Sequence, residues 1–500
     1  MSAIITEKFR KHNANQFHES FSESSANAYY LFIGKATAFT SSTTTGSDSS
    51  PPTPADAVGE TQYYAWDSML AAKKITSDDI QFAVPRRNWA NSTTYDMYKH
   101  NISSSNTATS GASNLYDSTF YFITSDYRVY KVLDNNGGTA YSGSEPTSES
   151  SSPFALGGYV LKYMFKISAS DAAKYLTTDY FPVQTDSTVS AAATDGAIES
   201  IVVTAGSGYT DGTYYAAVYG DGTNQGTSSG AVIRITVSSG SIQSFGLTAG
   251  SDTTIHAAGA GYTFGTVNLG SDYIFSDSSL SSSSTLGASG SGGEIEVIIS
   301  PKEGHGNDAT TELGAHYVMT ATTLSEAEGD DLTTANDFRQ VGLMIDPTTY
   351  GTSTVASVTT ARQTFVVKGS ATSGTFEADE QITQASTGAV GKVVEFDSDR
   401  SLLYYQQERF SGFGTNATTS GYVAFSGTNA ITGQTSSATL TPSSDTETVT
   451  LANSNTLTLT TGYANPELQP DSGNIIYLEN RKPIQRDSDQ TEDIKLIIEF

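Results

Sequence analysis

The last residues of the chain alternate apolar and polar side chains, and this pattern constrains the fold more than any other stretch. Ile494, Leu496, Ile498 and Phe500 fall on one face of an extended segment, with charged residues on the other. Burying each such side chain stabilises by roughly 1.5 to 3 kcal/mol. The sequence therefore predicts a half-buried core strand here, against which the N-terminal part of the chain should pack.

A β-prone run precedes this strand. Ile475 to Leu478 (IIYL) is predicted to be a short strand, followed by a polar turn through Asn480 and Pro483. The two strands together would bring distant segments to one core, so long insertions are expected in the middle of the chain.

Composition favours a β-rich protein. The 500 residues suggest two to four domains. Charged residues make up 16%, whereas 28 Tyr and 22 Phe recur between runs rich in Ser, Thr and Gly. Because aromatic and β-branched residues alternate with these polar runs, we expect short strands and long loops rather than disorder.

Charge and cysteine content exclude several functions. A net charge of -27 opposes binding to nucleic acid, which requires clustered Lys and Arg. The absence of cysteine excludes disulfides, thiolate chemistry and Cys-ligated zinc. No stretch has the length of a signal peptide core or a membrane span, so we expect no membrane insertion and assembly in a host cytoplasm.

Two helices and several strands are predicted by periodicity. The helices are a packing helix over Thr6–Phe21, with Phe9, Phe17 and Phe21 near one side, and one over Val58–Lys74. The strands are expected at 29–33, 118–124, 126–134, 158–167, 201–203, 233–237 and 402–406. Tyr159, Leu161, Tyr163 and Phe165 would form an aromatic sheet face, which could bind sugars but more simply packs in a core.

Two pairs of internal repeats mark small β modules. GSGYTDGT at Gly206–Thr213 recurs as GAGYTFGT at Gly259–Thr266, and Tyr209 and Tyr262 would be plugs or exposed aromatics. ITQASTGAVGKV at 382–393 resembles ITGQTSSATL at 431–440. The Ser/Gly tract over 276–293 is predicted to be a linker.

Candidate binding residues are few. Arg86 and Arg87 beside Trp89 could bind an anion or stack on an aromatic ring, but pairing with local carboxylates at a turn is favoured. His305, Asp308 and His316 could hold a metal, although their spacing favours a polar turn.

No catalytic motif stands out. GTSSG at 226–230 matches a nucleophile elbow in letters, yet no helix is expected after it. A glycosidase needs only two suitably spaced carboxylates, but the sequence singles out no such pair. We therefore expect no enzyme activity, no catalytic, cofactor-binding or metal-binding residues, and no cofactor.

Several motifs carry a family resemblance. They are IYLENRKPI at 476–484, DQTEDI at 489–494, VPRRNW at 84–89, GGYVLKYMFKI at 157–167 and DFRQVGLMIDP at 337–347. Taken together, and in the order in which they follow one another along the chain, these motifs resemble the baseplate wedge protein encoded by gene eight of T-even-type contractile-tailed phages. Two long middle segments lie outside the resemblance.

The resemblance implies a fold and a function. It implies a mainly β protein with a few peripheral helices, in which a two-domain core of β-sandwich type carries small inserted β modules. The expected boundaries are core domain I at 1–84, middle domain II at 85–195, an inserted module at 196–300, a core segment at 301–350, a second inserted module at 351–464 and the C-terminal core strands at 465–500.

The implied role is structural. Members of the family are homodimers that contact neighbouring wedge subunits in the virion tail baseplate, take part in its assembly, and belong to the rearrangement that triggers sheath contraction. Composition alone also supports an alternative, a carbohydrate-binding or depolymerising tail protein.

Overall fold

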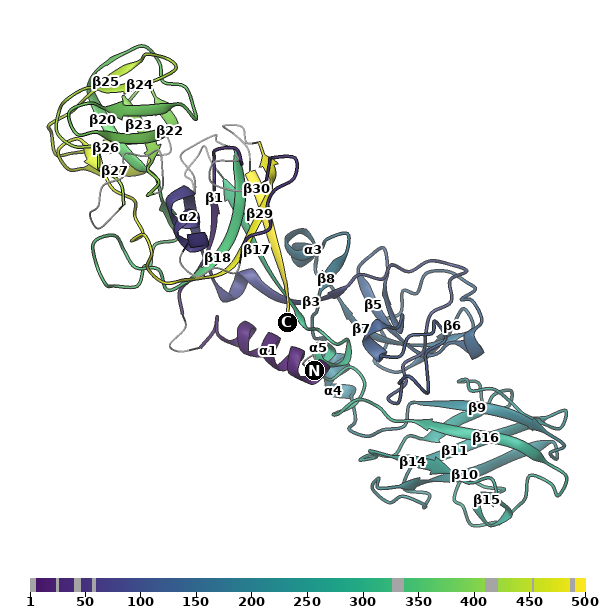
Figure 1. The fold of residues 1–500 in the computed structure, drawn as a ribbon. Helices are drawn as coiled ribbons and strands as arrows, with labels where there is room; N and C mark the ends of the chain where they lie inside the picture. Colours follow the sequence, from purple (N-terminus) through teal and green to yellow (C-terminus); the bar gives the residue numbers. More distant parts are fainter. Residues whose placement is uncertain are drawn as a thin grey trace. The chain divides into compact units, whose positions relative to one another are not determined.

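The chain forms two compact units, each built from segments far apart in the sequence. The computed structural model describes residues 6–23, 27–39, 46–55, 60–325, 337–409, 421–451, 454–485 and 491–500. Unit 1 contains residues 1–15, 81–319 and 497–500, and unit 2 contains residues 16–80 and 320–496 (Figure 1). Strands dominate both units, which confirms the predicted mainly β class with a few helices.

The central sheet of unit 2 has the strand order β19-β2-β1-β18-β29. Its strands are β1 (Tyr29–Gly34), β2 (Met69–Ile75), β18 (Phe338–Ile345), β19 (Thr360–Arg362) and β29 (Asn474–Ile484). The predicted strand at 29–33 is confirmed as β1, which is buried along its whole length between antiparallel β2 and β18. The sheet therefore joins an N-terminal strand to one from the last thirty residues.

The helix predicted over Val58–Lys74 is only partly correct. Helix α2 (Glu60–Ser68) ends where β2 begins. Leu, Ala and Lys in the Met69–Ile75 segment favour a helix locally, but this segment pairs with β1 on one side and β19 on the other. Two ladders of backbone hydrogen bonds outweigh the local preference.

The predicted turn at Asn480 and Pro483 is wrong, because β29 continues through both residues to Ile484. Proline lacks the N–H that a central strand must donate, but β29 lies at the edge of its sheet. Asn480 instead bonds across the sheet to Gln340 at 2.8 Å and to the carbonyl of Pro52 at 2.9 Å.

The second inserted module is a closed barrel within unit 2 (Figure 1). Its strands are β20 (Phe365–Ser373), β21 (Gln381–Gln384), β22 (Ala389–Asp397), β23 (Leu402–Gln406), β24 (Ile431–Gly433), β25 (Thr439–Pro442) and β28 (Tyr463–Ala464). The order β23-β22-β21-β24-β25-β20 closes through pairing of β20 with β23, and β28 adds to β20. Closure leaves no unpaired edge among the six barrel strands.

The repeat detected in this module explains the barrel. One copy forms the β21–β22 hairpin, the other forms the β24–β25 hairpin, and β21 pairs with β24. The pairing of β20 with β25 corresponds to that of β23 with β22. The barrel therefore consists of two three-stranded halves, β20-β25-β24 and β23-β22-β21, which pair with each other through β20 with β23 and β24 with β21. The short hairpin β26 (Glu447–Thr450) and β27 (Thr456–Leu459) lies beside it in sequence.

Unit 1 contains an aromatic four-stranded sheet with the order β4-β5-β7-β6. Its strands are β4 (Tyr121–Ile123), β5 (Arg128–Asp134), β6 (Phe154–Leu156) and β7 (Tyr159–Lys166). The predicted strands at 118–124, 126–134 and 158–167 are confirmed. Tyr159 and Tyr163 are buried in the core that this sheet forms, so their rings pack against protein rather than facing solvent.

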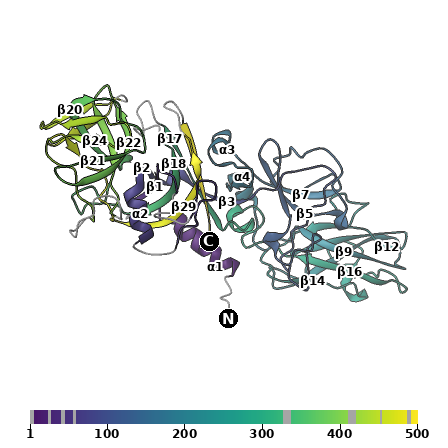
Figure 2. The same ribbon diagram turned by 45° about the horizontal axis from the view of Figure 1, so that its top comes forward.

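The first inserted module lies in the same unit (Figure 2). It contains β9 (Ser200–Ser207), β10 (Gly212–Gly220), β11 (Val232–Ser238), β12 (Ser241–Ile242), β13 (Thr254–Ala257), β14 (Gly265–Val267), β15 (Ile274–Phe275) and β16 (Ser291–Ile298). β9 pairs with β16, and β10 and β11 form the centre of the second sheet. Its core also includes Leu133 and Val160 from the aromatic sheet.

The glycines of the first repeat pair adopt the same left-handed backbone. Gly206 and Gly259 have φ of 58° and 62°, a region that favours glycine. The hydroxyls of Tyr209 and Tyr262 each accept a backbone N–H, from Gly293 at 2.8 Å and Ala231 at 3.1 Å. Both tyrosines therefore brace a turn against a neighbouring segment.

The Ser/Gly tract over 276–293 is not a linker. Its Leu286 is 3% exposed in the module core, and the Leu286 carbonyl accepts the N–H of Thr210 at 2.7 Å. The tract then enters β16 at Ser291. Glycine-rich composition alone indicated flexibility, but a single large apolar residue anchors the segment.

A further sheet has the order β30-β17-β3-β8. Its strands are β3 (Ile80–Pro85), β8 (Tyr180–Pro182), β17 (Tyr317–Ser325) and β30 (Thr491–Glu499). The terminal strand prediction is confirmed by β30, in which Ile494 and Leu496 are buried and Ile498 is half-buried. Residues 489 and 490 of the DQTEDI motif lie outside the described residues.

Short helices complete the fold. They are α1 (Glu7–Glu19), α3 (Ala169–Tyr175), α4 (Ser187–Ala192), α5 (Ala309–Glu312) and four 3-10 turns at Ser77–Asp79, Leu115–Asp117, Asn136–Gly138 and Ser271–Tyr273. Helix α1 confirms the predicted N-terminal helix, but Phe9 is 54% exposed while Phe17 and Phe21 pack edge to face. Across the described part of the chain, every helix is too short or too polar to cross a bilayer.

Candidate functional site

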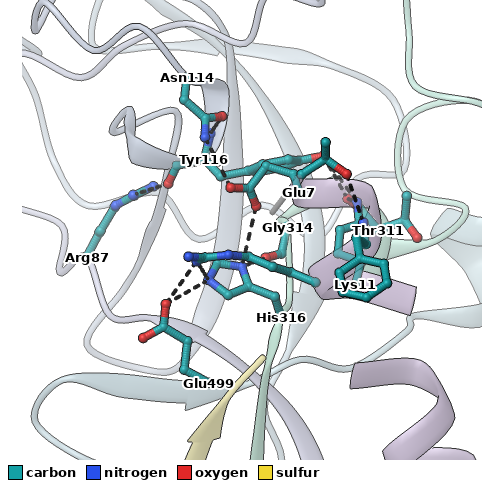
Figure 3. A network of polar contacts seen from close by, with 12 residues as sticks. Glu7, Lys11, Arg87, Asn114, Tyr116, Thr311, Gly314, His316 and Glu499 are labelled. Atoms are coloured by element: carbon teal, nitrogen blue, oxygen red, sulfur yellow. Dashed lines mark hydrogen bonds and ion pairs between the residues drawn. The ribbon is translucent and has the colours of Figure 1, made fainter. Parts of the chain in front are cut away.

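A network of polar contacts in unit 1 holds helix α1 and the end of β30 to the segment around His316 (Figure 3). We call it the terminal clamp. Its members are Glu7, Arg10, Lys11, Tyr116, His316 and Glu499. They come from α1, the 115–117 turn, the segment after α5 and β30, and they are brought together by the fold alone.

Lys11 forms one side of the clamp. Its Nζ donates to the Thr311 carbonyl at 2.7 Å and to the Tyr116 hydroxyl at 3.2 Å. Burial lowers the pKa of Lys11, while the nearby carboxylates of Asp308 and Glu7 partly offset that shift. Burial also raises the pKa of Tyr116 to about 12, so its hydroxyl stays neutral and keeps its proton for the Thr311 carbonyl.

His316 forms the other side. Its Nδ1 lies 2.9 Å from the Gly314 carbonyl, and since a carbonyl only accepts, this nitrogen carries the proton. The Nε2 atom then accepts from Arg10 at 3.4 Å, and Arg10 pairs with Glu499 at 2.9 Å. The N–H of Phe500 donates to the His316 carbonyl at 3.1 Å, which fixes the end of the strand.

Two groups in the clamp are less fully satisfied. Glu7 Oε2 is buried without a hydrogen bond and lies 3.8 Å from His316 Nδ1, and its other oxygen accepts from Asn114 at 3.4 Å. His316 Nε2 also lies 3.8 Å from Glu499. The His316 ring therefore lies between two carboxylates and one guanidinium.

Among the described residues, neither arginine of the VPRRNW segment pairs with a carboxylate, which contradicts the favoured interpretation of them. Arg86 donates to the Thr177 carbonyl at 2.7 Å and to Asn88 at 2.8 Å. Arg87 donates to the Tyr116 carbonyl at 2.8 Å and stacks over Tyr121 at 4.4 Å from its centroid. The aromatic stacking alternative is confirmed for Arg87, and its bond to the Tyr116 carbonyl connects it to the clamp (Figure 3).

A second cluster is fully buried beneath the aromatic sheet of unit 1. Lys131 Nζ lies 2.8 Å from Glu312 Oε2 and 2.8 Å from His305 Nδ1, and all three side chains are at most 1% exposed. The ammonium also lies 3.9 Å from the Tyr98 ring centroid. Glu312 Oε1 accepts the Gly306 N–H at 2.6 Å. We call these residues the buried cluster.

Electrostatics fix the charge states of this cluster. Burial, and then the neighbouring Lys131, lowers the pKa of His305 to about 4, so the ring is neutral at neutral pH. Burial also lowers the pKa of Lys131, opposed by Glu312. For Glu312, burial would raise the pKa, but Lys131 and His305 outweigh it and hold the pKa well below its usual range.

The three candidate metal ligands are not brought together. His305 belongs to the buried cluster, His316 belongs to the terminal clamp, and Asp308 caps α5 by accepting the Thr311 N–H at 3.0 Å. Among the described residues, no group of three His, Asp or Glu side chains could hold a metal ion. The GTSSG letters occupy the connection between strands β10 and β11, where the fold has no strand-to-helix bend.

Sequence reasoning missed both clusters. Arg10 and Glu499 are 489 positions apart, and Lys131 and Glu312 are 181 apart, so no local spacing connects them. The available signal was the placement of Lys131 and Lys162, each flanked on both sides by aliphatic or aromatic residues of its strand. The clamp joins segments from both ends of the chain to the segment around His316.

Comparison with protein families finds a match to segments at both ends of the chain. The family described as bacteriophage T4 Gp8 matches residues 3–147 and 437–500. Comparison with curated proteins finds no match. The matched segments contain all members of the terminal clamp except His316, and they omit most of both inserted modules.

Proposed function

Because the N- and C-terminal segments of the chain match the bacteriophage T4 Gp8 family, we propose that the chain is a member of this family and acts as a baseplate wedge subunit in assembly and in the rearrangement that triggers sheath contraction. A match to this family supports a structural role in the phage baseplate, within the virion tail. The wedge role and the triggering role are the proposal.

The terminal clamp is the observation that carries the proposal. The two matched segments are separated by almost three hundred residues, yet Arg10 and Glu499 form an ion pair within unit 1. A family core that spans both chain ends needs such a connection. Polar contacts suit an element that must hold during assembly and be rearranged later, because they can be exchanged for contacts to water or to a partner.

The domain boundaries and the partners are part of the proposal. The chain forms a homodimer and contacts neighbouring wedge subunits through obligate interfaces, which usually bury roughly 2,000 to 5,000 Å². The modules at 196–300 and 351–464 are insertions that face additional partners or a host surface. Deleting either module without an effect on wedge assembly or infectivity would count against that role.

The alternative role as a carbohydrate-binding or depolymerising protein gains no support from the aromatic strand, since Tyr159 and Tyr163 are buried. Light scattering of the purified protein, alone and with candidate wedge subunits, tests the two roles. A dimer that enters a larger complex supports the wedge role. A stable trimer that ignores those subunits contradicts it.

A further inference from the structure

The buried cluster has the composition of a reaction centre rather than of a simple ion pair. A primary amine and a carboxylate are in contact, at 2.8 Å between Lys131 Nζ and Glu312 Oε2, with neither exposed by more than 1%. Removing two ions from water is costly, and their mutual attraction often fails to repay that cost. Conversion of the pair to a neutral group would remove this penalty.

The neighbouring groups supply what such a conversion requires. His305 is neutral, and its Nδ1 lies 2.8 Å from the amine, within hydrogen-bond reach for taking a proton from that nitrogen. The same Nδ1 lies 3.8 Å from Glu312 Oε2, the atom that must receive the proton, so delivery requires the ring to approach that oxygen. The Gly306 N–H lies 2.6 Å from Glu312 Oε1, where negative charge develops when the carboxyl carbon is attacked. The Tyr98 ring covers the ammonium.

We propose that Lys131 and Glu312 condense to an intramolecular amide bond, a covalent cross-link between β5 and α5. This modification goes beyond the proposed structural role and does not depend on it. The amine of Lys131 is the nucleophile, the side-chain carboxyl carbon of Glu312 is the electrophile, and His305 is the proton carrier.

The step is balanced without any co-reactant. A proton passes from the Lys131 ammonium to Glu312 Oε2, which leaves a free amine facing a carboxylic acid. The nitrogen lone pair forms the N–C bond, and the π electrons move to Oε1 beside the Gly306 N–H. His305 Nδ1 takes a proton from nitrogen and delivers it to Oε2, the C–Oε2 bond breaks, and one water leaves. The amide keeps one N–H, and His305 is neutral again.

The neighbouring Lys162–Glu199 pair provides an internal control. Lys162 lies opposite Lys131 on β7, and its Nζ lies 3.3 Å from Glu199 Oε2. The Glu199 side chain is 20% exposed, and within the described part of the chain the contacts of this pair include no histidine or backbone N–H. Water can reach this pair, so it should stay ionic.

The intact mass of the purified full-length protein tests the proposal. The expected mass is that of the sequence minus one water molecule. Trypsin should leave Lys131 uncut and yield one branched peptide that joins residues 129–162 to residues 303–339. A protein that keeps its full sequence mass, or loses water at another site, overturns the proposal.

Variants separate the roles of the cluster residues. Lys131→Met should restore the full mass for that sequence, whereas Lys162→Met should keep the loss of one water. His305→Phe, shown to be folded by circular dichroism, should form the branched peptide far more slowly. Equal rates in His305→Phe and wild type would overturn the assignment of His305 as proton carrier.

Discussion

Gly314 lets the ring of Tyr116 lie directly against the backbone in the terminal clamp. Gly314 has a φ of 72°, and a Cβ there would lie 2.2 Å from Tyr116 Cδ1. The hydroxyl of the same ring contacts Lys11. The side chain of a single residue would therefore displace the aromatic support of the clamp.

Gly314→Ala should lower the free energy of unfolding by more than a second glycine substitution with the same backbone angle. Gly351 also has a φ of 72°, but a Cβ there meets no atom within 4 Å. Gly351→Ala should show only the cost of a left-handed alanine, about 1 to 2 kcal/mol. Gly314→Ala should add about 1 to 3 kcal/mol of overpacking. Urea unfolding of both variants measures the difference, and equal losses would contradict the packing argument.

His305 should make the protein sensitive to mild acid. Its pKa is lowered from 6.5 to about 4 in the folded chain, so the unfolded chain binds a proton first as pH falls. This contribution to stability is complete above pH 6.5 and is lost between pH 6.5 and about 4. At pH 5 the loss should be about 2 kcal/mol. Urea unfolding of wild type and His305→Phe at pH 7 and pH 5 tests this prediction, since the variant should not show the loss of unfolding free energy that His305 causes.

Asp134 should make the protein more stable, rather than less stable, as pH falls. Burial raises its pKa from 3.8 to about 6, so the charged carboxylate costs stability at pH 7 and the cost disappears as pH falls below 3.8. Asp134→Asn keeps an acceptor for the Asn136 N–H. It should stabilise by up to about 3 kcal/mol at pH 7 and by little at pH 3.5. A gain that is independent of pH would show that the charge is not its cause.

At the scale of elements, the two inserted modules differ in how their cores are closed. The barrel core is made of residues between Phe365 and Tyr463, with no contribution from the sheet that carries the module. The core of the first module includes Leu133 and Val160 from the aromatic sheet. The barrel is therefore self-contained, whereas the first module is completed by its neighbour.

Residues 364–464 should fold alone, with cooperative thermal unfolding and dispersed amide resonances. Residues 199–300 expressed alone should be less stable, because the apolar surface that covers Leu133 and Val160 would face water at roughly 25 cal/mol per Å². Circular dichroism and NMR of the two fragments test this. A barrel fragment without a cooperative transition would contradict the self-contained core.

Alternating segments were predictable, and segments defined by distant partners were not. The strands at 29–33 and 402–406 follow from local pattern, because their burial matches a period or a continuous apolar run. Met69–Ile75 was misassigned because its propensity is helical and its strand state depends on β1 and β19. The clamp was invisible in sequence because its ion pairs join chain ends.

At the scale of the molecule, polar contacts carry the docking of α1. Ala14 is the one fully buried residue of α1, and Phe17 packs edge to face on Tyr29, so the apolar contacts of the helix lie in its C-terminal half. Arg10 and Lys11 together contact Glu499, His316, Tyr116 and Thr311. Loss of these contacts should release the helix without unfolding the sheets.

Arg10→Gln combined with Lys11→Gln should accelerate hydrogen exchange in α1 and at the Phe500 amide, which donates to His316. Arg481→Gln is a matched control, since Arg481 and Glu479 form an exposed pair at 3.7 Å. The control should leave exchange in α1 unchanged. Mass spectrometry of both variants measures the effect, and unaltered exchange in the double variant would show that the clamp does not hold the helix.

The first and last strands of the barrel module, β20 and β28, are neighbours that are hydrogen-bonded to each other. Val366 pairs with Ala464, and Val367 pairs with Tyr463. The two ends of this module of about one hundred residues therefore lie as close together as the ends of a tight turn, so the module adds little constraint to the rest of the chain. Recombination could exchange such a cassette for another with equally close ends, so tail genes could diversify their surface at this position while the framework beneath stays unchanged.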